Sequence, residues 1–92
     1  MLNLRYGSHF KKDFRKALKQ KGQTLEKFKT VMEYLRNEIP LPPEYADHKL
    51  SGKYEGYREC HIMPDWLLIY RVEEKTVTLI LLRTGSHSDL FK

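Results

Sequence analysis

The sequence predicts an α+β fold: a short N-terminal strand, two helices, then a three- to four-stranded, mostly antiparallel sheet. Three observations lead to this prediction. The N-terminal residues alternate with the period of a strand, two apolar stripes follow at helical spacing, and the second half is rich in β-branched and aromatic residues between turn signals. A chain of 92 residues has room for one small core. A single domain over residues 1–92 is therefore expected.

Residues 2–6 alternate between apolar and polar side chains, which predicts a short half-buried strand that ends at Gly7. Two amphipathic helices are expected to follow. Ser8 is positioned to cap the first helix and Thr24 the second, in which apolar residues recur every three or four positions from residue 25 to residue 39. Both apolar stripes are expected to face the core, so that the basic side chains between them face solvent.

The second half is expected to contain a loop followed by three strands. Three prolines between residues 40 and 50 predict a long loop, because proline lacks the backbone N–H that helices and central strands need. Residues 54–63, 66–72 and 76–82 have strand composition and are separated by turn signals. With both helices on one face of the sheet, the opposite face is expected to be open and to form a shallow basic groove.

Basic residues are concentrated at the start of the chain. The formal net charge is +5 with histidine neutral, yet residues 1–36 alone carry +7 and the remainder carries −2. A basic third in a small domain is typical of a protein that approaches a polyanion such as nucleic acid. A solvated helix face explains the same charge without a partner, and charge alone leaves both interpretations open.

Several classes of protein are excluded by what the sequence lacks. The longest apolar run, residues 66–70, is much shorter than the roughly 20 residues of a membrane-spanning helix, and no signal-peptide pattern opens the chain. The single cysteine, Cys60, cannot form an internal disulfide, which suits a reducing compartment. A cytoplasmic protein with no membrane partner is therefore expected. Motifs for nucleotide hydrolysis, dinucleotide binding and esterase chemistry are absent.

The sequence also contains no recognisable metal-binding motif. Cys60 and His61 are adjacent on an expected strand, so their side chains point to opposite faces and cannot share an ion. No His-x-His, Cys-x-x-Cys or His-Glu-x-x-His spacing occurs, and the acidic residues do not cluster as two-metal chemistry requires. Catalysis without a metal or another cofactor is therefore expected.

Histidine, carboxylate and arginine side chains remain as candidates for chemistry. Together they can cleave RNA through its own 2′-OH: a base removes the 2′ proton, a cation stabilises the charged transition state, and an acid protonates the 5′ oxygen. Arginine suits the cation role because its planar guanidinium matches phosphate oxygens. Aromatic side chains can stack on bases, with core packing as the alternative for Trp66 and Tyr70. The candidate catalytic residues are His48, His61, Asp65, Arg83 and His87.

The second half of the chain resembles a known family. The motifs that carry the resemblance are Pro40-Leu-Pro, Asp47-His48, Gly56-Tyr-Arg-Glu59, His61-Ile, Pro64-Asp-Trp66 and Arg83-Thr-Gly-Ser-His87, followed by Phe91. They are similar to the YafQ-type branch of the RelE superfamily of toxins. The resemblance implies the RelE-like microbial RNase fold and the toxin of a type II toxin–antitoxin pair. Residues 1–39 share only the order of elements and the basic charge.

The resemblance further implies a ribosome-dependent mRNA endoribonuclease that cleaves mRNA in the ribosomal A site without metal and is held inactive by a cognate antitoxin. It implies that His87 is the general acid and Arg83 the phosphate clamp. Asp65 would act with His48 or His61 as the base and its orienter.

Substrate and ribosome contacts are expected on two other groups of side chains. Phe91 and Trp66 are the candidates for contact with a substrate base. The basic helices are expected to meet the ribosome and its RNA, through Lys11, Lys12, Arg15, Lys16 and Lys19.

Three alternatives are weighed against this interpretation. An RNA- or ribosome-binding inhibitor of translation that does not cleave would need arginine and aromatic residues, but has no use for three histidines beside a carboxylate. A metal-dependent nuclease would lose activity with a chelator. A protein that only pairs with another chain explains neither the basic first third nor the polar loops.

Overall fold

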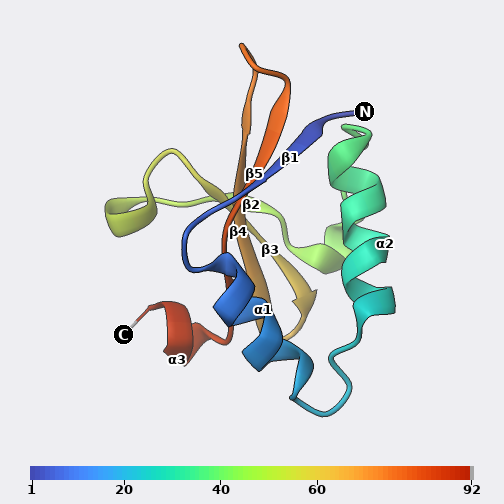
Figure 1. Ribbon diagram of the computed structural model, residues 1–92, viewed down its shortest axis with the longest axis vertical. Coiled ribbons are helices and arrows are strands. Elements are labelled where there is room, and N and C mark those ends of the chain that lie inside the picture. The colour runs from blue at the N-terminus through green and yellow to red at the C-terminus, as the bar shows by residue number, and fades with distance from the viewer. Residues whose placement is uncertain (92) are drawn as a thin grey trace.

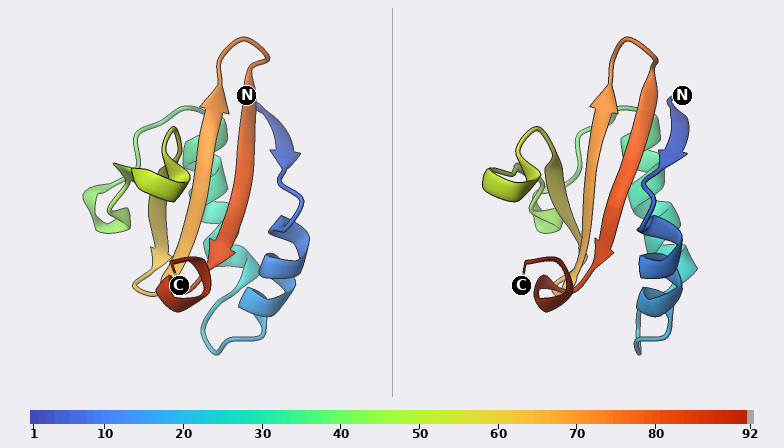
Figure 2. Two further views of the ribbon diagram at one scale, coloured as in Figure 1. Left: turned by 90° about the vertical axis from the view of Figure 1, so that its left-hand side faces the viewer. Right: turned by 60° about the vertical axis from the view of Figure 1, so that its left-hand side comes forward.

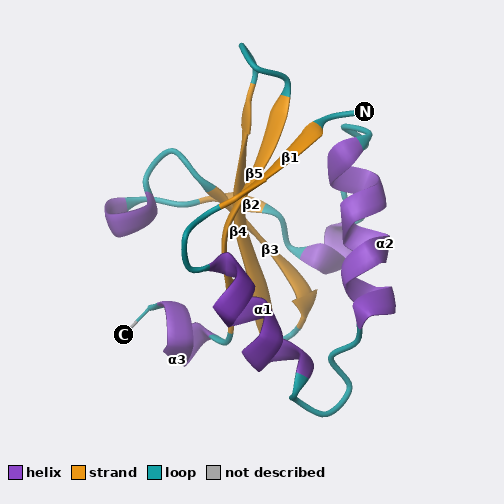
Figure 3. Cartoon of the chain, viewed as in Figure 1, coloured by secondary structure: helices purple, strands orange, loops and turns teal. Residues whose placement is uncertain are grey.

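The computed structural model describes residues 1–91. They form a five-stranded sheet in the order β1-β5-β4-β3-β2, with α1 and α2 on one face (Figures 1 and 3). Among these residues, no helix is both long and apolar enough to span a bilayer. The strands are β1 (Asn3–Tyr6), β2 (His48–Lys49), β3 (Arg58–Met63), β4 (Trp66–Glu73) and β5 (Thr78–Gly85). The helices are α1 (Phe10–Leu18), α2 (Leu25–Arg36) and α3 (His87–Leu90), with 3-10 helices at Pro43–Tyr45 and Gly52–Tyr54.

The sheet is mixed, and four strands follow the two helices, one more than the three located by residue range and within the three to four expected. β1 lies at one edge and runs parallel to β5, whereas every other neighbouring pair is antiparallel. The additional strand is β2, which falls in the segment expected to be a loop and pairs with β3 at the other edge. The α+β class, the strand–helix–helix order and the mostly antiparallel sheet are confirmed.

The helix caps agree with the sequence at α2 and differ at α1. The Thr24 hydroxyl accepts a hydrogen bond from the Lys27 backbone N–H at 3.3 Å, as a threonine N-cap should. The prediction of Ser8 as the cap of α1 is wrong. The N-cap there is His9, whose side chain makes no capping bond, and the backbone N–H of Phe10 donates to the Gly7 carbonyl instead.

Two apolar cores lie on opposite faces of the sheet, because successive side chains of β4 alternate. Trp66, Leu68 and Tyr70 pack with the helices, whereas Leu67 and Ile69 pack on the other face. That second face is not the open basic groove expected. The 3-10 helix Gly52–Tyr54 and α3 lie over part of it (Figure 2), and their buried side chains complete a small second core.

Candidate active site

Strand register places three of the five candidate residues, His48, His61 and Arg83, on the sheet face away from α1 and α2. His48 pairs with Glu59, which pairs with Ile69. Ile69 pairs in turn with Arg83, so these four positions form one row across β2, β3, β4 and β5. Side chains paired across strands point to the same face, and His61 shares it because it lies two residues after Glu59.

The structure brings together the three histidines that the sequence singled out. The ring centroids of His48 and His61 are 6.3 Å apart, and those of His61 and His87 are 5.7 Å apart. The Phe91 ring continues the series at 6.3 Å from His87. Phe91 is exposed, so its face is available to a substrate base.

Glu59 is a site residue that sequence reasoning missed. Its Oε1 lies 3.5 Å from His48 Nε2 and 3.4 Å from His61 Nε2, and the residue is only 3% exposed. Its Oε2 is buried without a hydrogen-bond partner among the described residues. A buried acidic side chain needs compensation, which the two flanking imidazoles supply. The available signal was the Glu59-x-His61 spacing, which puts both side chains on one face of a strand.

Asp65 contacts His87 and neither of the other two histidines. Its Oδ1 accepts hydrogen bonds from the backbone N–H of His87 at 2.9 Å and from Nδ1 of the same residue at 2.8 Å. These bonds lower the pKa of the Asp65 carboxyl. An ionised carboxylate only accepts hydrogen bonds, so Nδ1 of His87 carries a hydrogen and Nε2 is its free nitrogen. The expected pairing of Asp65 with His48 or His61 is therefore corrected.

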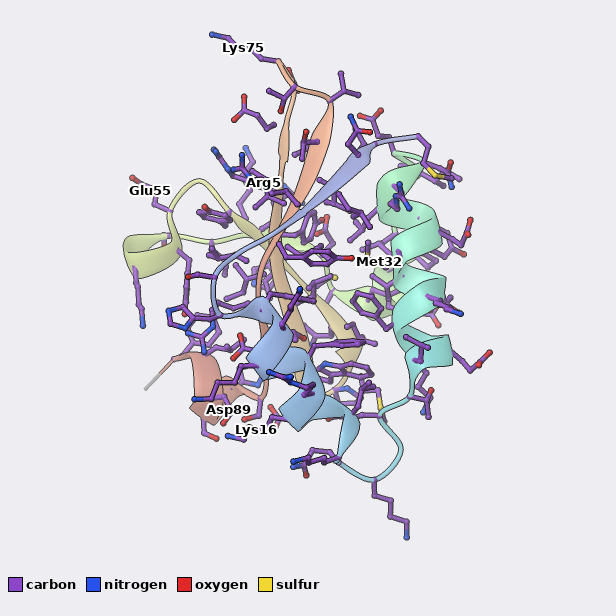
Figure 4. The ribbon with its side chains drawn as sticks, viewed as in Figure 1. Arg5, Lys16, Met32, Glu55, Lys75 and Asp89 are labelled. Carbon is purple, nitrogen blue, oxygen red and sulfur yellow. The ribbon has the colours of Figure 1, made fainter. Side chains whose placement is uncertain are left out.

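His87 is held in place by the capping of α3. The hydroxyl of Ser86 accepts from the backbone N–H of Asp89, and the Asp89 carboxylate accepts from the backbone N–H of Ser86, which is a capping box. Lys16 on α1 donates to the same carboxylate at 3.0 Å (Figure 4). Gly85 has φ of +155°, and a side chain there would crowd Asp89. Glycine is therefore required where β5 turns into α3.

Arg83 occupies the active-site row, but its guanidinium is held by Asp13 on α1. Nε donates to Oδ2 at 2.6 Å and Nη2 donates to Oδ1 at 3.0 Å. This pair raises the pKa of Arg83. The backbone N–H of Thr84 also donates to Asp13. Asp13, which the sequence did not single out, therefore fixes the end of β5.

The expectation that Trp66 stacks on a substrate base is wrong. Its side chain is fully buried in the helix-side core, where Nε1 donates to the Thr84 hydroxyl at 2.9 Å. That hydroxyl donates in turn to the Leu67 carbonyl at 2.6 Å. Trp66 supports the strand that carries Arg83 and cannot reach a ligand.

The basic residues of α1 border a groove that leads to this site. The groove has a volume of about 590 Å³ and lies between α1 and the β5–α3 turn, with Lys12 and Lys16 on one side and Asp65, Arg83 and Ser86 on the other. The five basic side chains expected to contact ribosome or RNA are all exposed, at Lys11, Lys12, Arg15, Lys16 and Lys19. Lys16 is in addition paired with Asp89.

A group of side chains with the chemistry of metal ligands also lies in the site. One ligand atom each from Glu59, His61 and His87 lie within 4.8 Å of one another. Two imidazole nitrogens and a carboxylate oxygen suit Zn²⁺ or Cu²⁺. Sequence spacing could not reveal this group, because β3 and α3 contribute to it from distant parts of the chain. Cys60 takes no part: it is buried, and burial raises the pKa of its thiol.

Comparison with known proteins identifies relatives along nearly the whole chain. Residues 2–92 match the family model described as the bacterial toxin of type II toxin–antitoxin systems, YafQ. The mRNA interferase toxin YafQ of Escherichia coli is 40% identical over 90 residues, which is 97% of this chain and 95% of that protein.

Solved structures show the same fold. The metal-bound toxin from Helicobacter pylori is 42% identical with a TM-score of 0.89, covering 99% of this chain and 100% of that one. The toxin in the E. coli DinJ–YafQ complex is 39% identical with a TM-score of 0.84, and the match covers both chains completely.

Proposed function

The chain belongs to the YafQ family of type II toxin–antitoxin toxins, the mRNA interferases, and we propose that it cleaves mRNA in the ribosomal A site by metal-independent acid–base catalysis, which inhibits translation. The convergence of His48, His61 and His87 with two carboxylates on one face of the sheet carries this proposal. The partners are then mRNA, the ribosome and a cognate antitoxin, as the DinJ complex of the E. coli relative suggests.

His87 is the general acid in this mechanism. Asp65 holds Nδ1 of His87, so that Nε2 is the nitrogen that can carry and release a proton. As the 2′ oxygen bonds to phosphorus, the bond from phosphorus to the 5′ oxygen breaks and that oxygen takes the proton from Nε2. The products are a 2′,3′-cyclic phosphate and a 5′-hydroxyl end.

The base comes from the cluster around Glu59. His48 is the more exposed of the two histidines beside this carboxylate, and its Nε2 lies on the site side. It takes the 2′-OH proton, and Glu59 stabilises the imidazolium that results. His61, between His48 and His87, positions the shared carboxylate.

Arg83 supplies positive charge to the phosphate. Its guanidinium borders the groove that ends at Asp65 and keeps its charge at any physiological pH. Phe91 stacks on a base next to the scissile bond, and the exposed α1 lysines neutralise ribosomal RNA phosphates.

In this proposal, metal binding competes with catalysis for the same side chains. The H. pylori toxin is a relative with bound metal. The ligand set Glu59, His61 and His87 fits a divalent ion. Coordination would occupy the nitrogen of His87 that donates the proton. We therefore propose that bound metal inhibits cleavage.

The decisive experiment is cleavage of a translated message by the purified chain. Reactions are run in a translation extract with and without a zinc-selective chelator that leaves ribosomal Mg²⁺ in place, and on naked RNA with and without EDTA. His87→Ala is run beside the wild type, and the product ends are mapped. Cuts within translated codons that resist the chelator and end in a cyclic or 3′-phosphate support the proposal.

Two results would oppose it. Translation that stops while the message stays intact would indicate a ribosome-binding inhibitor without cleavage. Cleavage of naked RNA that EDTA abolishes would indicate a metal-dependent nuclease.

A further inference from the structure

His48 lies on a strand too short to hold it by backbone pairing alone. β2 has two residues, lies at the sheet edge and pairs only with β3, through His48–Glu59 and Lys49–Arg58. The segment before it contains three prolines and a single 3-10 turn. Two ladder pairs at an edge are a weak constraint, so another contact must fix the imidazole.

That contact lies on the other face of the sheet, at Asp47. Its carboxylate accepts from Nη2 of Arg58 at 2.8 Å and from Nε of the same side chain at 3.2 Å. The hydroxyl of the buried Tyr70 also donates to it. Tyr70 belongs to the core on the helix side of the sheet, so Asp47 is anchored on that face, whereas His48 pairs with Glu59 and faces the site.

The anchored turn holds the histidine ring directly. Ala46 has φ of +48°, the left-handed conformation that a non-glycine residue adopts only when its surroundings impose it. Its carbonyl lies 2.7 Å from Nδ1 of His48. A carbonyl can only accept, so Nδ1 carries the hydrogen in every protonation state and Nε2 faces Glu59.

We propose that Asp47 is a positioning residue: its bonds to Arg58 and Tyr70 hold the turn at Ala46, which fixes the tautomer of His48 and leaves Nε2 to act as base. The role of His48 as base rests on the proposed function. The position of the hydrogen on Nδ1 of His48 does not, because it follows from the contact with the Ala46 carbonyl. Burial and the bond to Asp47 both raise the pKa of Tyr70, which keeps its hydroxyl a donor.

The test compares Asp47→Asn and Asp47→Ala with Glu73→Gln. The control removes the Arg71–Glu73 ion pair at 3.2 Å, far along β4 from the site. Nitrogen-15 shifts of the His48 ring report which nitrogen carries the hydrogen. Steady-state cleavage on programmed ribosomes gives kcat and KM, and thermal melting reports global stability.

We expect wild type and control to show only the Nδ1–H form. Asp47→Ala should populate the Nε2–H form and lower kcat about 10- to 100-fold with little change in KM, since a misplaced catalytic group costs that much. Asp47→Asn, which retains an acceptor oxygen for one donor, should fall between the two. Tyr70→Phe removes one of the anchoring bonds and should shift the tautomer if the alanine variant does not fold.

An unchanged tautomer in both folded Asp47 variants and in Tyr70→Phe would overturn the positioning role. A changed tautomer with kcat equal to the control would overturn the base role of His48. If the wild type itself does not cleave, the proposed function fails, and the nitrogen-15 measurement still decides whether Asp47 positions the ring.

Discussion

Asp13 and Arg83, 70 residues apart in the chain, form a two-bond ion pair that connects the basic helix α1 to the row of paired residues that contains His48 and Glu59. Asp13 is the one acidic residue within α1. It accepts from Arg83 and from the Thr84 backbone, so the helix that carries the expected ribosome-binding lysines also aims the expected phosphate clamp. A shift of α1 would therefore displace the Arg83 guanidinium.

We predict that Asp13→Asn lowers the cleavage rate about tenfold or more, because Arg83 loses the carboxylate that orients it and an oriented cation contributes strongly to transition-state stabilisation. Single-turnover cleavage on programmed ribosomes measures the effect. Glu26→Gln, on an exposed turn of α2, is the matched control. Equal rates for the two variants would show that Arg83 needs no orientation from α1.

His87→Gln should reduce cleavage at least about 100-fold, because it removes the general acid while keeping the size of the side chain. The same substitution at His9, which makes no capping bond, serves as control. A substrate with sulfur in place of the bridging 5′ oxygen needs no acid, because the thiolate is a good leaving group. It should restore the rate of the His87 variant. No restoration would argue against the acid role.

The sequence predicted the parts of the fold that are encoded locally. The cap of α2 was predicted because the Thr24 hydroxyl bonds only to the backbone N–H three residues further along the chain. The strand β4 was predicted from its run of apolar residues, which lies buried between the two cores. The strand at His48 was not predicted, because two residues are too few to show an alternating apolar–polar pattern. Only their pairing with β3 defines them as a strand. Ser8 failed as a cap because the Gly7 carbonyl takes the N–H of Phe10.

The sequence predicted which histidines form the site, but not which carboxylate contacts each histidine. The three histidines do meet, but the carboxylate beside His48 and His61 is Glu59, and Asp65 belongs to His87. These pairings depend on register across β3 and on the α3 turn, which one sequence does not specify. For Trp66 the sequence left core packing open beside base stacking, and the helices packed over β4 put its side chain in the core.

The basic surface should control ribosome affinity. We predict that Lys11, Lys12 and Lys19 changed together to Glu weaken ribosome binding and lower its salt dependence, since each lysine that neutralises a phosphate releases a counterion. Lys16 is left unchanged because its bond to Asp89 supports α3. Lys75→Glu, in the hairpin at the far end of the molecule (Figure 4), is the control. Binding as tight as that of the control at physiological salt would exclude this surface.

Zinc should bind at Glu59, His61 and His87 and inhibit cleavage, with activity restored by a zinc-selective chelator that leaves ribosomal Mg²⁺ in place. Loss of one ligand in Glu59→Gln should weaken zinc binding by at least about tenfold in calorimetry. His9→Gln should bind as wild type does. Unchanged affinity in the Glu59 variant would place the ion elsewhere, and activation of the chelated protein by zinc would contradict metal-independent cleavage.

The capping of α3 should make stability depend on pH through Asp89. Bonds from the Ser86 backbone and from Lys16 lower the pKa of this carboxyl to about 2. A carboxyl whose pKa is lower in the folded state stabilises the protein above its unfolded value of about 4, and this stabilisation is lost as the pH falls through 2. Asp65, whose pKa is also lowered, acts in the same direction.

We predict that Asp89→Asn lowers the free energy of unfolding by about 1 kcal/mol at pH 7, the usual value of a lost capping interaction at a partly exposed site. The difference from wild type should shrink as the pH falls from 4 to 2, because the Asp89 carboxyl then binds a proton in the unfolded chain but stays ionised in the folded one. Urea titrations at pH 7, 4 and 2 measure it, with Glu74→Gln in the exposed hairpin as control. A difference that stays constant with pH would mean that the carboxylate charge does not stabilise α3.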